Sequence, residues 1–458
     1  MAKSAGKYRL SRSRPSTAAV VVLSAVVAIL LLGACGGDGD RDDAGAIVLD
    51  VWFHTGQEAE RRTIEDQVGR FNRRHAATGA MEVRLTMLPE GSYNAQVQAA
   101  ALAGDLPDLL ELDGPYVANY AWQGHLVALE GLLSEELQND LLPSIIAQGL
   151  YGVDPAVEHL YAVGTFDSGL GLWARRSRLE AAGVRIPGTP AEAWTVAELR
   201  TVLTALAAQD EDGAVLDLKL NQHGEWLTYA FAPVIQSAGA DLIGRGSQRG
   251  GSAEGTLNSP AARAALEEVQ SWITAGYVDA NVDDAAFVTG RVALSWVGHW
   301  EFRRYAQSAG DDLILLPLPD FGAGSRTGQG SWAWAVTTAC DHREAAVRFL
   351  EFLLEPAEVL AMAGANGAIP ATRQAVAASQ LYGEGGRLRL FVTQIEDGRS
   401  VPRPRTPAYP VITAAFQQAA LELKSGGDLQ VALDRAAAEI DEELRDNRGY
   451  GRGDDLEQ

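Results

Sequence analysis

Large aromatic residues and glycines gather in one stretch of the chain, residues 287–334. Four of the ten tryptophans lie there: Trp296, Trp300, Trp332 and Trp334. Glycines stand beside both pairs, on either side of a strand-like apolar segment at 313–318. Large aromatic rings are usually buried, so a hydrophobic core explains any single tryptophan. A glycine beside a ring, however, allows a ligand to approach closely. We therefore interpret the two clusters as aromatic walls of a concave binding site.

The order of short motifs around this stretch resembles a known family. Phe287, a Gly-Arg pair at 290–291, a small apolar strand and Gly298 two residues before Trp300 come first. Prolines, a turn at 330–331 and the helical sequence EAAVRFLEFLLEPAEVLAMAG then follow. This order, from residue 47 to the end of the chain, is similar to that of the carbohydrate-binding proteins of bacterial ABC importers. These are the maltose-binding-protein-like members of extracellular solute-binding protein family 1.

The resemblance implies an α/β protein with the two-lobed periplasmic-binding-protein fold of type II. Each lobe is expected to be a mostly parallel sheet flanked by helices, and crossover segments form the hinge. The implied function is extracytoplasmic capture of a di- or oligosaccharide between the lobes and its delivery to the transmembrane permease of an ABC transporter. We expect a monomer that contacts the membrane only through an N-terminal lipid.

A sugar presents hydroxyl groups at its edges and C–H groups on its faces. Its site therefore needs charged or amide groups for hydrogen bonds and aromatic rings for stacking. The polar candidates in this chain are Glu58, Asp113, Asp167, Glu301, Arg373 and Arg403, with the turn residues Gly298, Gly330 and Ser331. The aromatic candidates are Trp226, Tyr229, Trp296, Trp300, Trp332 and Tyr409. For most of the acids, a helix cap or a solvated charge is the alternative interpretation.

The resemblance singles out six of these candidates. Glu58, Asp113 and Asp167 match positions at which the family often binds hydroxyl groups, and Trp300, Trp332 and Tyr409 match its common stacking positions. The pair Trp332 and Trp334 must point to opposite faces, because side chains alternate along a strand. We expect Trp332, beside the glycine-rich turn, to face the ligand and Trp334 to lie in the core.

The N-terminus has the pattern of a bacterial lipoprotein precursor. A basic segment is followed by an apolar run at 18–32 and by the sequence Leu-Gly-Ala-Cys, which ends at Cys35. This is a secretory signal peptide of residues 1–34, with Cys35 as the expected lipidation site. The apolar run is short for the ~20 residues of a membrane span. Residues 35–45 are a polar, flexible tether. We therefore predict an extracytoplasmic protein anchored to the cell membrane by its lipid.

Composition excludes several classes. Cleavage before Cys35 leaves 424 residues, more than the ~250–300 that a single core supports, so two domains are expected. The formal charge falls from −22 to about −27 because the removed segment carries five cations and no acid. Such a negative surface argues against nucleic-acid binding. Only Cys340 remains besides Cys35, and the seven histidines lack ligand spacing, so we expect no metal site and no cofactor.

Alternating strands and helices indicate the α/β class. The run 47–53 is apolar enough for a buried parallel strand, and strands at 82–88 and 107–113 follow, with Ser92 as the expected cap of a helix that ends at Ala103. Ligands of such sheets bind beyond the carboxyl ends of the strands, where His54 and Asp113 fall.

Glycines at 164–171 suit a hinge, and we place the crossovers at 160–173, 292–297 and 362–370. The first lobe then comprises residues 46–166 and 297–364, and the second comprises 167–296 and 365–458.

Enzyme motifs are missing from the sequence. It contains no G-x-S-x-G elbow, no H-E-x-x-H motif and no P-loop. We therefore expect a binding protein and not an enzyme. A lipid-anchored glycoside hydrolase is the alternative that the sequence leaves open, because it needs only two well-placed carboxylates among the 60 acids.

Overall fold

The computed structural model describes residues 46–76, 81–154, 156–245 and 251–451. The expected signal peptide, Cys35 and the rest of the tether lie outside these ranges. Within them, no helix combines the length and the apolar composition that a membrane span requires.

A five-stranded sheet forms the centre of the first lobe, in the order β2-β1-β3-β13-β6. Its strands are β1 (Ile47–Thr55), β2 (Met81–Pro89), β3 (Leu109–Asp113), β6 (Ala162–Val163) and β13 (Trp332–Val336). The strands β2 and β3 both pair with β1 in parallel, as expected from the apolar run in β1. The late strand β13 enters antiparallel to β3 and places Trp332 opposite Asp113.

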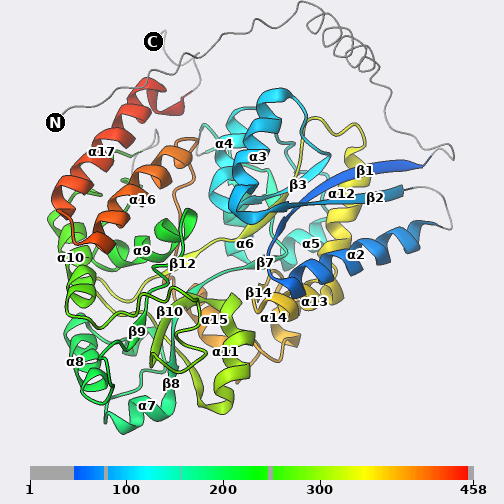
Figure 1. Ribbon diagram of the computed structural model, residues 1–458. Coiled ribbons are helices and arrows are strands. Elements are labelled where there is room, and N and C mark those ends of the chain that lie inside the picture. Colours follow the sequence, from blue (N-terminus) through cyan, green and yellow to red (C-terminus); the bar gives the residue numbers. More distant parts are fainter. Residues whose placement is uncertain (1–45, 77–80, 155, 246–250, 452–458) are drawn as a thin grey trace, which may run out of the picture. The chain divides into compact units, whose positions relative to one another are not determined.

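Helices cover both faces of this sheet because its strands alternate between two cores. Leu49, Val51 and Phe53 face α2, α12 and α13, whereas Leu110 and Leu112 face α3 and α4. Figure 1 shows α12 beside the blue N-terminal strands, although some 290 residues separate them in sequence. The elements around the sheet are α2 (Glu58–Ala76), α3 (Glu90–Ala103), η1 (Gly114–Tyr116), α4 (Val117–Trp122), α5 (Glu135–Asp140), α6 (Pro143–Gly149), β4 (Leu150–Tyr151), β5 (His159–Leu160), α12 (Arg343–Leu353), α13 (Pro356–Asn366) and α14 (Arg373–Ala378).

A four-stranded sheet in the order β11-β8-β10-β9 forms the centre of the second lobe. Its strands are β8 (Leu170–Arg175), β9 (Leu216–Asp217), β10 (Leu294–Gly298) and β11 (Leu313–Leu316). The two-lobed α/β class is confirmed. The sheet is mixed in detail, because β8 runs antiparallel to both of its neighbours and only β9 and β10 pair in parallel.

The second lobe also has a core on each face of its sheet. Leu172 and Trp296 pack with α8, α9, α10, α16 and α17, whereas Trp173 and Val297 pack with α11 and α15. In Figure 1 the orange and red C-terminal helices lie against the green helices α9 and α10. The helices are α7 (Arg176–Ala181), η2 (Pro190–Glu192), α8 (Val196–Ala207), α9 (Glu225–Ser237), α10 (Pro260–Thr274), η3 (His299–Glu301), α11 (Phe302–Ala309), η4 (Gly310–Asp312), α15 (Arg389–Glu396), α16 (Tyr409–Ser425), α17 (Leu429–Asp446) and η5 (Arg448–Tyr450).

Two small pairs of strands join the lobes. The strand β7 (Phe166–Asp167) pairs with β14 (Ile369–Pro370), and β12 (Thr327–Gln329) pairs with β15 (Ser400–Pro402). The first pair lies within or at the edge of the crossovers expected at 160–173 and 362–370.

The crossover expected at 292–297 is wrong. Strand β10 stays in the second sheet, and so does β11, because these two strands satisfy both edges of β8. The chain returns to the first sheet only at β13, after β12, so residues 297–326 belong with the second lobe. The boundary predicted between 364 and 365 is also wrong, because Ala368, Ala371 and Ala375 lie in the core of the first lobe, to which α14 therefore belongs.

One predicted helix cap is also wrong. The helix α3 begins at Glu90, and the hydroxyl group of Ser92 donates to the carbonyl oxygen of Pro89 at 3.3 Å from inside the first turn. Thr195 and Ser259 do cap their helices, α8 and α10, because each side chain accepts from the backbone N–H three residues later.

Candidate functional site

Arg403 lies between a carboxylate of the first lobe and a carboxylate of the second. Its two terminal nitrogens donate to Asp113 Oδ1 and Oδ2 at 2.7 and 2.9 Å, and Nη1 also donates to Glu225 Oε1 at 2.7 Å. The side chain of Arg403 is only 6% exposed. The planar guanidinium group matches the two oxygens of Asp113, and such charge-assisted pairs are among the strongest hydrogen bonds in proteins. We call these three residues the interlobe ion cluster.

Each member of the interlobe ion cluster stands at the end of a regular element. Asp113 is the last residue of β3, Glu225 is the first residue of α9, and Arg403 follows the connecting strand β15. The N-terminus of a helix favours a carboxylate, because its free N–H groups carry partial positive charge. The sequence thus brings three segments, 112 to 290 residues apart, to one point between the lobes.

Residues of α16 complete the hydrogen bonds of Glu225. The hydroxyl group of Tyr409 donates to Oε1, and the Thr413 hydroxyl group donates to Oε2 at 2.7 Å. Burial and the nearby charge of Asp113 raise the pKa of Glu225, and Arg403 opposes this effect. Tyr409 itself is buried edge-on against Tyr116 of the first lobe, at a ring distance of 5.5 Å.

Three aromatic side chains of the second lobe adjoin this cluster. The guanidinium group of Arg403 lies 4.9 Å from the ring centroid of Tyr229, which is within range of a cation–π contact. Tyr229 is 6.2 Å from Trp300, and Trp300 meets Trp226 at 5.9 Å with an interplanar angle of 86°. Trp226 and Trp300 are half-buried, so part of each ring faces solvent. We call Trp226 and Trp300 the aromatic corner.

Gly298 makes the position of the Trp300 ring available. A Cβ atom on Gly298 would lie 2.0 Å from Cζ3 of that ring, which is far below van der Waals contact. Gly298 is therefore needed for the position of the Trp300 ring, and the space beside it is occupied by that ring.

Trp332 forms the aromatic wall of the first lobe. One face of its ring stacks on His54 at 3.8 Å with an interplanar angle of 7°, and its edge meets Tyr93 at 5.3 Å. Trp332 is half-buried, whereas Trp334, two residues along β13, is 1% exposed and lies in the core with Phe53. The two tryptophans therefore alternate as expected for a strand.

Buried polar groups hold His54 beneath Trp332. The Nδ1 atom of His54 is 2.7 Å from Glu111 Oε2, and Nε2 is 3.7 Å from Glu60 Oε2. Burial lowers the pKa of His54, and burial also raises the pKa of Glu111 well above its ordinary value. Both shifts have the same cause, since burial disfavours the charged form of each group.

Asp167 is buried at the first crossover. Its Oδ1 atom accepts from the backbone N–H groups of Ser168 at 2.8 Å and Gly330 at 3.2 Å, and from Gln148 Nε2 at 3.3 Å. The Gln148 side chain also accepts from the N–H of Ser331 at 2.8 Å. Burial raises the pKa of Asp167, and the side chain of Ser144 and the hydrogen bonds from the backbone of Ser168 and Gly330 oppose the rise. Asp167 and Gln148 thus tie the crossover to the glycine-rich turn before β13.

The space among these residues is small. A cavity of about 10 Å³, enough for about one water molecule, is lined by Gly114, Gln148, Gly330, Arg403 and four neighbours. A larger hollow of about 350 Å³ lies along β11, between Trp173, Ile186 and Arg387. None of the predicted site residues lines this hollow, so the larger hollow and the candidate site lie in different places.

The matched family model covers residues 56–359, two thirds of the chain, and describes the bacterial extracellular solute-binding protein. The chain belongs to the bacterial extracellular solute-binding protein family. A lipoprotein of unknown function from Streptomyces antibioticus, encoded in the oleD 5′ region, is 25% identical to this solute-binding protein over 379 residues, which are 78% of this chain and 77% of the relative.

Two crystal structures illustrate the shared fold. The GacH receptor of Streptomyces glaucescens, which was solved unliganded and with acarbose, matches with a TM-score of 0.71 and 22% identity over 87% of this chain and 97% of its own. The cyclic α-maltosyl-1,6-maltose binding protein of Arthrobacter globiformis matches with a TM-score of 0.69 and 22% identity over 88% of this chain and all of its own.

The structure brings most of the predicted site residues of this solute-binding protein together. Asp113, Arg403, Tyr409, Tyr229, Trp226 and Trp300 form one connected group around the interlobe ion cluster. Trp332 joins it because it pairs with Asp113 across the sheet. Asp167, Gly330 and Ser331 line the adjoining crossover.

Four predicted residues are not part of this group. Glu58 is exposed and pairs with Arg62 one helical turn away, and Arg373 donates to the backbone carbonyl groups of Asn139 and Leu141. Trp296 is 2% exposed and lies within the core of the second lobe, whereas Trp300 only packs against that core and stays half-buried. Glu301 turns instead into a buried ion network around Lys219.

Sequence reasoning missed Glu225, Gln148 and the roles of His54 and Glu111. Glu225 directly precedes the candidate Trp226, and its position before an apolar helical segment was a usable signal. Glu111 and His54 stand at or near the carboxyl ends of β3 and β1, where the sheet rule places binding groups. Nothing near Gln148 in the sequence marks it.

Proposed function

We propose that this protein is an extracytoplasmic receptor that binds an uncharged di- or oligosaccharide between its lobes and delivers it to an ABC permease. The observation that carries the proposal is the joint position of aromatic faces and charged hydrogen-bonding groups. Trp332 comes from the first lobe and the aromatic corner from the second, with the interlobe ion cluster adjoining both.

The chemistry of a sugar suits these residues. A pyranose ring stacks its C–H face on an indole, and its hydroxyl groups bond to carboxylates and to a guanidinium group. Asp113 and Glu225 carry two negative charges against the single positive charge of Arg403. This excess of negative charge disfavours a uronic acid or a sugar phosphate, because a like charge would enter a half-desolvated site.

The relatives support the same class of ligand. The GacH receptor was crystallised with acarbose, and the Arthrobacter protein is described as binding cyclic α-maltosyl-1,6-maltose. Both ligands are oligosaccharides or close analogues. The Streptomyces antibioticus relative is described as a lipoprotein, which supports lipid attachment of this chain at Cys35.

A binding role without catalysis fits the two carboxylates that stand between the lobes. Asp113 and Glu225 are both held by the guanidinium group of Arg403. A glycoside hydrolase instead needs one carboxyl group that is free to donate a proton and a second that attacks or activates water. We therefore propose that the protein releases its sugar unchanged.

Thermal-shift measurements against a panel of uncharged di- and oligosaccharides test the proposal. A ligand at 100 times its dissociation constant stabilises the folded protein by ~2.7 kcal/mol, which raises the melting temperature measurably. The matched uronic acids serve as negative controls. A panel in which no sugar changes the melting temperature would contradict the proposal. Chromatography after prolonged incubation separates binding from hydrolysis, because shorter products would indicate a glycoside hydrolase.

A further inference from the structure

Lys219 has a backbone conformation that its residue type rarely adopts. It lies between β9 and α9 with a φ angle of +52°, in the left-handed region that favours glycine. Its side chain is 3% exposed. A buried lysine in a strained backbone conformation persists only where the surrounding contacts hold it strongly.

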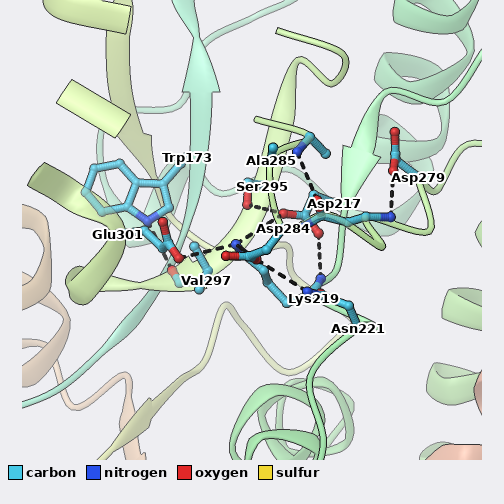
Figure 2. A network of polar contacts seen from close by, with 12 residues as sticks. Trp173, Asp217, Lys219, Asn221, Asp279, Asp284, Ala285, Ser295, Val297 and Glu301 are labelled. Atoms are coloured by element: carbon cyan, nitrogen blue, oxygen red, sulfur yellow. Dashed lines mark hydrogen bonds and ion pairs between the residues drawn. The ribbon is translucent and has the colours of Figure 1, made fainter. Parts of the chain in front are cut away.

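Carboxylates surround the ammonium group of Lys219 (Figure 2). Nζ lies 2.8 Å from Asp284 Oδ1, 3.3 Å from Glu301 Oε1 and 3.8 Å from Asp217 Oδ2. Burial alone lowers the pKa of Lys219, but the three carboxylates more than compensate and raise it. The ammonium group is therefore charged and fixed at the centre of the network. We call Lys219 and these three acids the Lys219 network.

The backbone of Lys219 is fixed at both ends. Its N–H donates to Asp217 Oδ1 at 2.7 Å, and Asp217 Oδ2 accepts from the hydroxyl group of Ser295 in β10 at 3.0 Å. The carbonyl oxygen of Lys219 accepts from the indole N–H of Trp226 at 3.0 Å. One residue thus connects the second sheet to a ring of the aromatic corner.

The ammonium group of Lys219 acts on Trp300 indirectly, through Glu301, the residue that follows Trp300 in sequence. Glu301 and Trp300 are adjacent in η3, so the Lys219–Glu301 ion pair restrains the short helix that carries Trp300. Trp226 and Trp300 meet nearly at right angles, and Lys219 contacts the chain on both sides of that meeting point.

We propose that Lys219 is a positioning residue that sets the right angle between Trp226 and Trp300 and thereby the affinity for sugar. The effect on affinity rests on the proposed function, whereas the effect on the geometry of the two rings does not. Lys219 touches no ligand in this proposal and acts only through the rings that it holds.

Arg304 provides a matched control. It donates to Asp284 Oδ2 at 2.6 Å and to both oxygens of Glu301 at 3.3 Å, so it neutralises two of the same acids. Among the bonds described for Arg304, none goes to Trp226 or to its carbonyl partner. Removing Arg304 therefore takes one cation from Asp284 and Glu301 but leaves the side chain of Lys219, which anchors the carbonyl group bonded to Trp226, in place.

The first experiment compares the affinities of the wild type, Lys219→Met and Arg304→Gln for the uncharged oligosaccharide that gives the largest thermal shift. Lys219→Met should weaken binding roughly tenfold, as expected for neighbouring coupled residues, and Arg304→Gln less than twofold. In a background that lacks both rings, Trp226→Ala with Trp300→Ala, the effect of Lys219→Met should vanish, whereas in a Trp332→Ala background it should persist. Equal losses for the two single variants, or a tenfold loss that survives when both rings are absent, would mean a general structural role and overturn the proposal.

The second experiment needs no ligand. Fluorine NMR of protein labelled with 5-fluorotryptophan gives one signal per indole, and Trp226→Phe and Trp300→Phe assign two of them. Lys219→Met should shift both of these signals and leave that of Trp332 unchanged. If Lys219→Met does not fold, Glu301→Gln tests the same link with the size of the side chain preserved. Unchanged signals from Trp226 and Trp300 in the folded variant would refute the proposal, even where no panel sugar binds.

Discussion

The interlobe ion cluster and the Lys219 network use the same chemistry in two different settings. Each holds one buried cation among two or three carboxylates, and each lies beside the tryptophans of the aromatic corner. Arg403 joins the two lobes and connects segments from three parts of the chain. All members of the Lys219 network belong to the second lobe, between β9 and η3.

The difference shows how location decides the role of a buried charge. A change in the distance between the lobes must break or move a bond of Arg403 to Asp113 or to Glu225, because these two acids belong to different lobes. The same motion leaves the Lys219 network intact. The planar fork of arginine suits the first setting, since it bonds two carboxylates in fixed directions, whereas the compact ammonium group of lysine suits a closed cluster of acids.

Replacing Arg403 should give the largest effect and tests the between-lobe cluster directly. Arg403→Met leaves Asp113 and Glu225 buried without a counter-charge, and we expect the free energy of unfolding to fall by about 3–5 kcal/mol. Urea denaturation measures this change. Arg405→Met is the matched control, because the side chain of Arg405 is 36% exposed and bonds to two backbone carbonyl groups and to the partly exposed Glu158, not to a buried acid. An Arg403→Met variant as stable as the wild type would show that Arg403 is not needed to neutralise Asp113 and Glu225.

Removing either aromatic wall tests the contribution of one lobe to binding, because Trp332 belongs to the first lobe and Trp300 to the second. Trp300→Ala and Trp332→Ala should each weaken sugar binding by about 2–4 kcal/mol, as aromatic hot spots do when truncated. The melting temperature without sugar should change little, since both rings are half-buried. Titration calorimetry and thermal melts measure the two quantities.

Trp334→Ala is the control for the wall variants. Trp334 is buried in the core of the first lobe, so its loss should cost about 3–5 kcal/mol of stability. If a Trp300 or Trp332 variant melts early but binds sugar normally, that tryptophan belongs to the core and not to the binding site.

A second contact between the lobes should respond to pH. His299 Nε2 is 2.9 Å from the hydroxyl group of Ser168, and Nδ1 is 3.2 Å from the carbonyl oxygen of Asn366. Burial lowers the pKa of His299 to about 4. Because the unfolded chain takes up a proton near pH 6.5 and the folded protein does not, stability is present above pH 6.5 and is lost as the pH falls toward 4.

Between pH 7 and pH 5 the loss from His299 should be about 2 kcal/mol. The buried acids Asp167 and Glu111 act in the opposite direction, since burial raises their pKa values. The informative quantity is therefore the difference between the wild type and His299→Gln in urea unfolding at the two pH values. Parallel pH profiles for the two proteins would show that His299 titrates normally in the folded state.

The smallest effects are expected at two predicted residues outside both clusters. Glu58→Gln and Arg373→Gln should change the affinity for sugar by less than twofold, because Glu58 is exposed beside Arg62 and Arg373 bonds to carbonyl groups of the first lobe. Surface changes of this kind are usually within ±0.5 kcal/mol in stability. A tenfold loss of affinity in either variant would indicate that the ligand contacts that residue and does not bind at the interlobe ion cluster.

Local patterns determined much of this protein. The apolar run of β1 specified a buried strand, Ser259 with Pro260 specified the start of α10, and the spacing of Trp332 and Trp334 specified opposite faces of β13. Each of these outcomes depends on neighbours within a few residues, which is the range over which periodicity and capping act.

Which charged side chains form ion pairs could be seen only in the folded structure. Arg403 finds Asp113 at a separation of 290 residues and Glu225 at 178, and Lys219 finds Glu301 at 82. Local signals place Asp113 at the end of a strand and Glu225 at the start of a helix, but none shows that these acids are buried beside Arg403. Strand pairing likewise decided where the chain returns to the first lobe. Both β10 and β11 pair with β8, so the chain passes to the first sheet only after β11. Burial of a charge depends on what the rest of the chain packs around it, and that packing is a property of the whole fold.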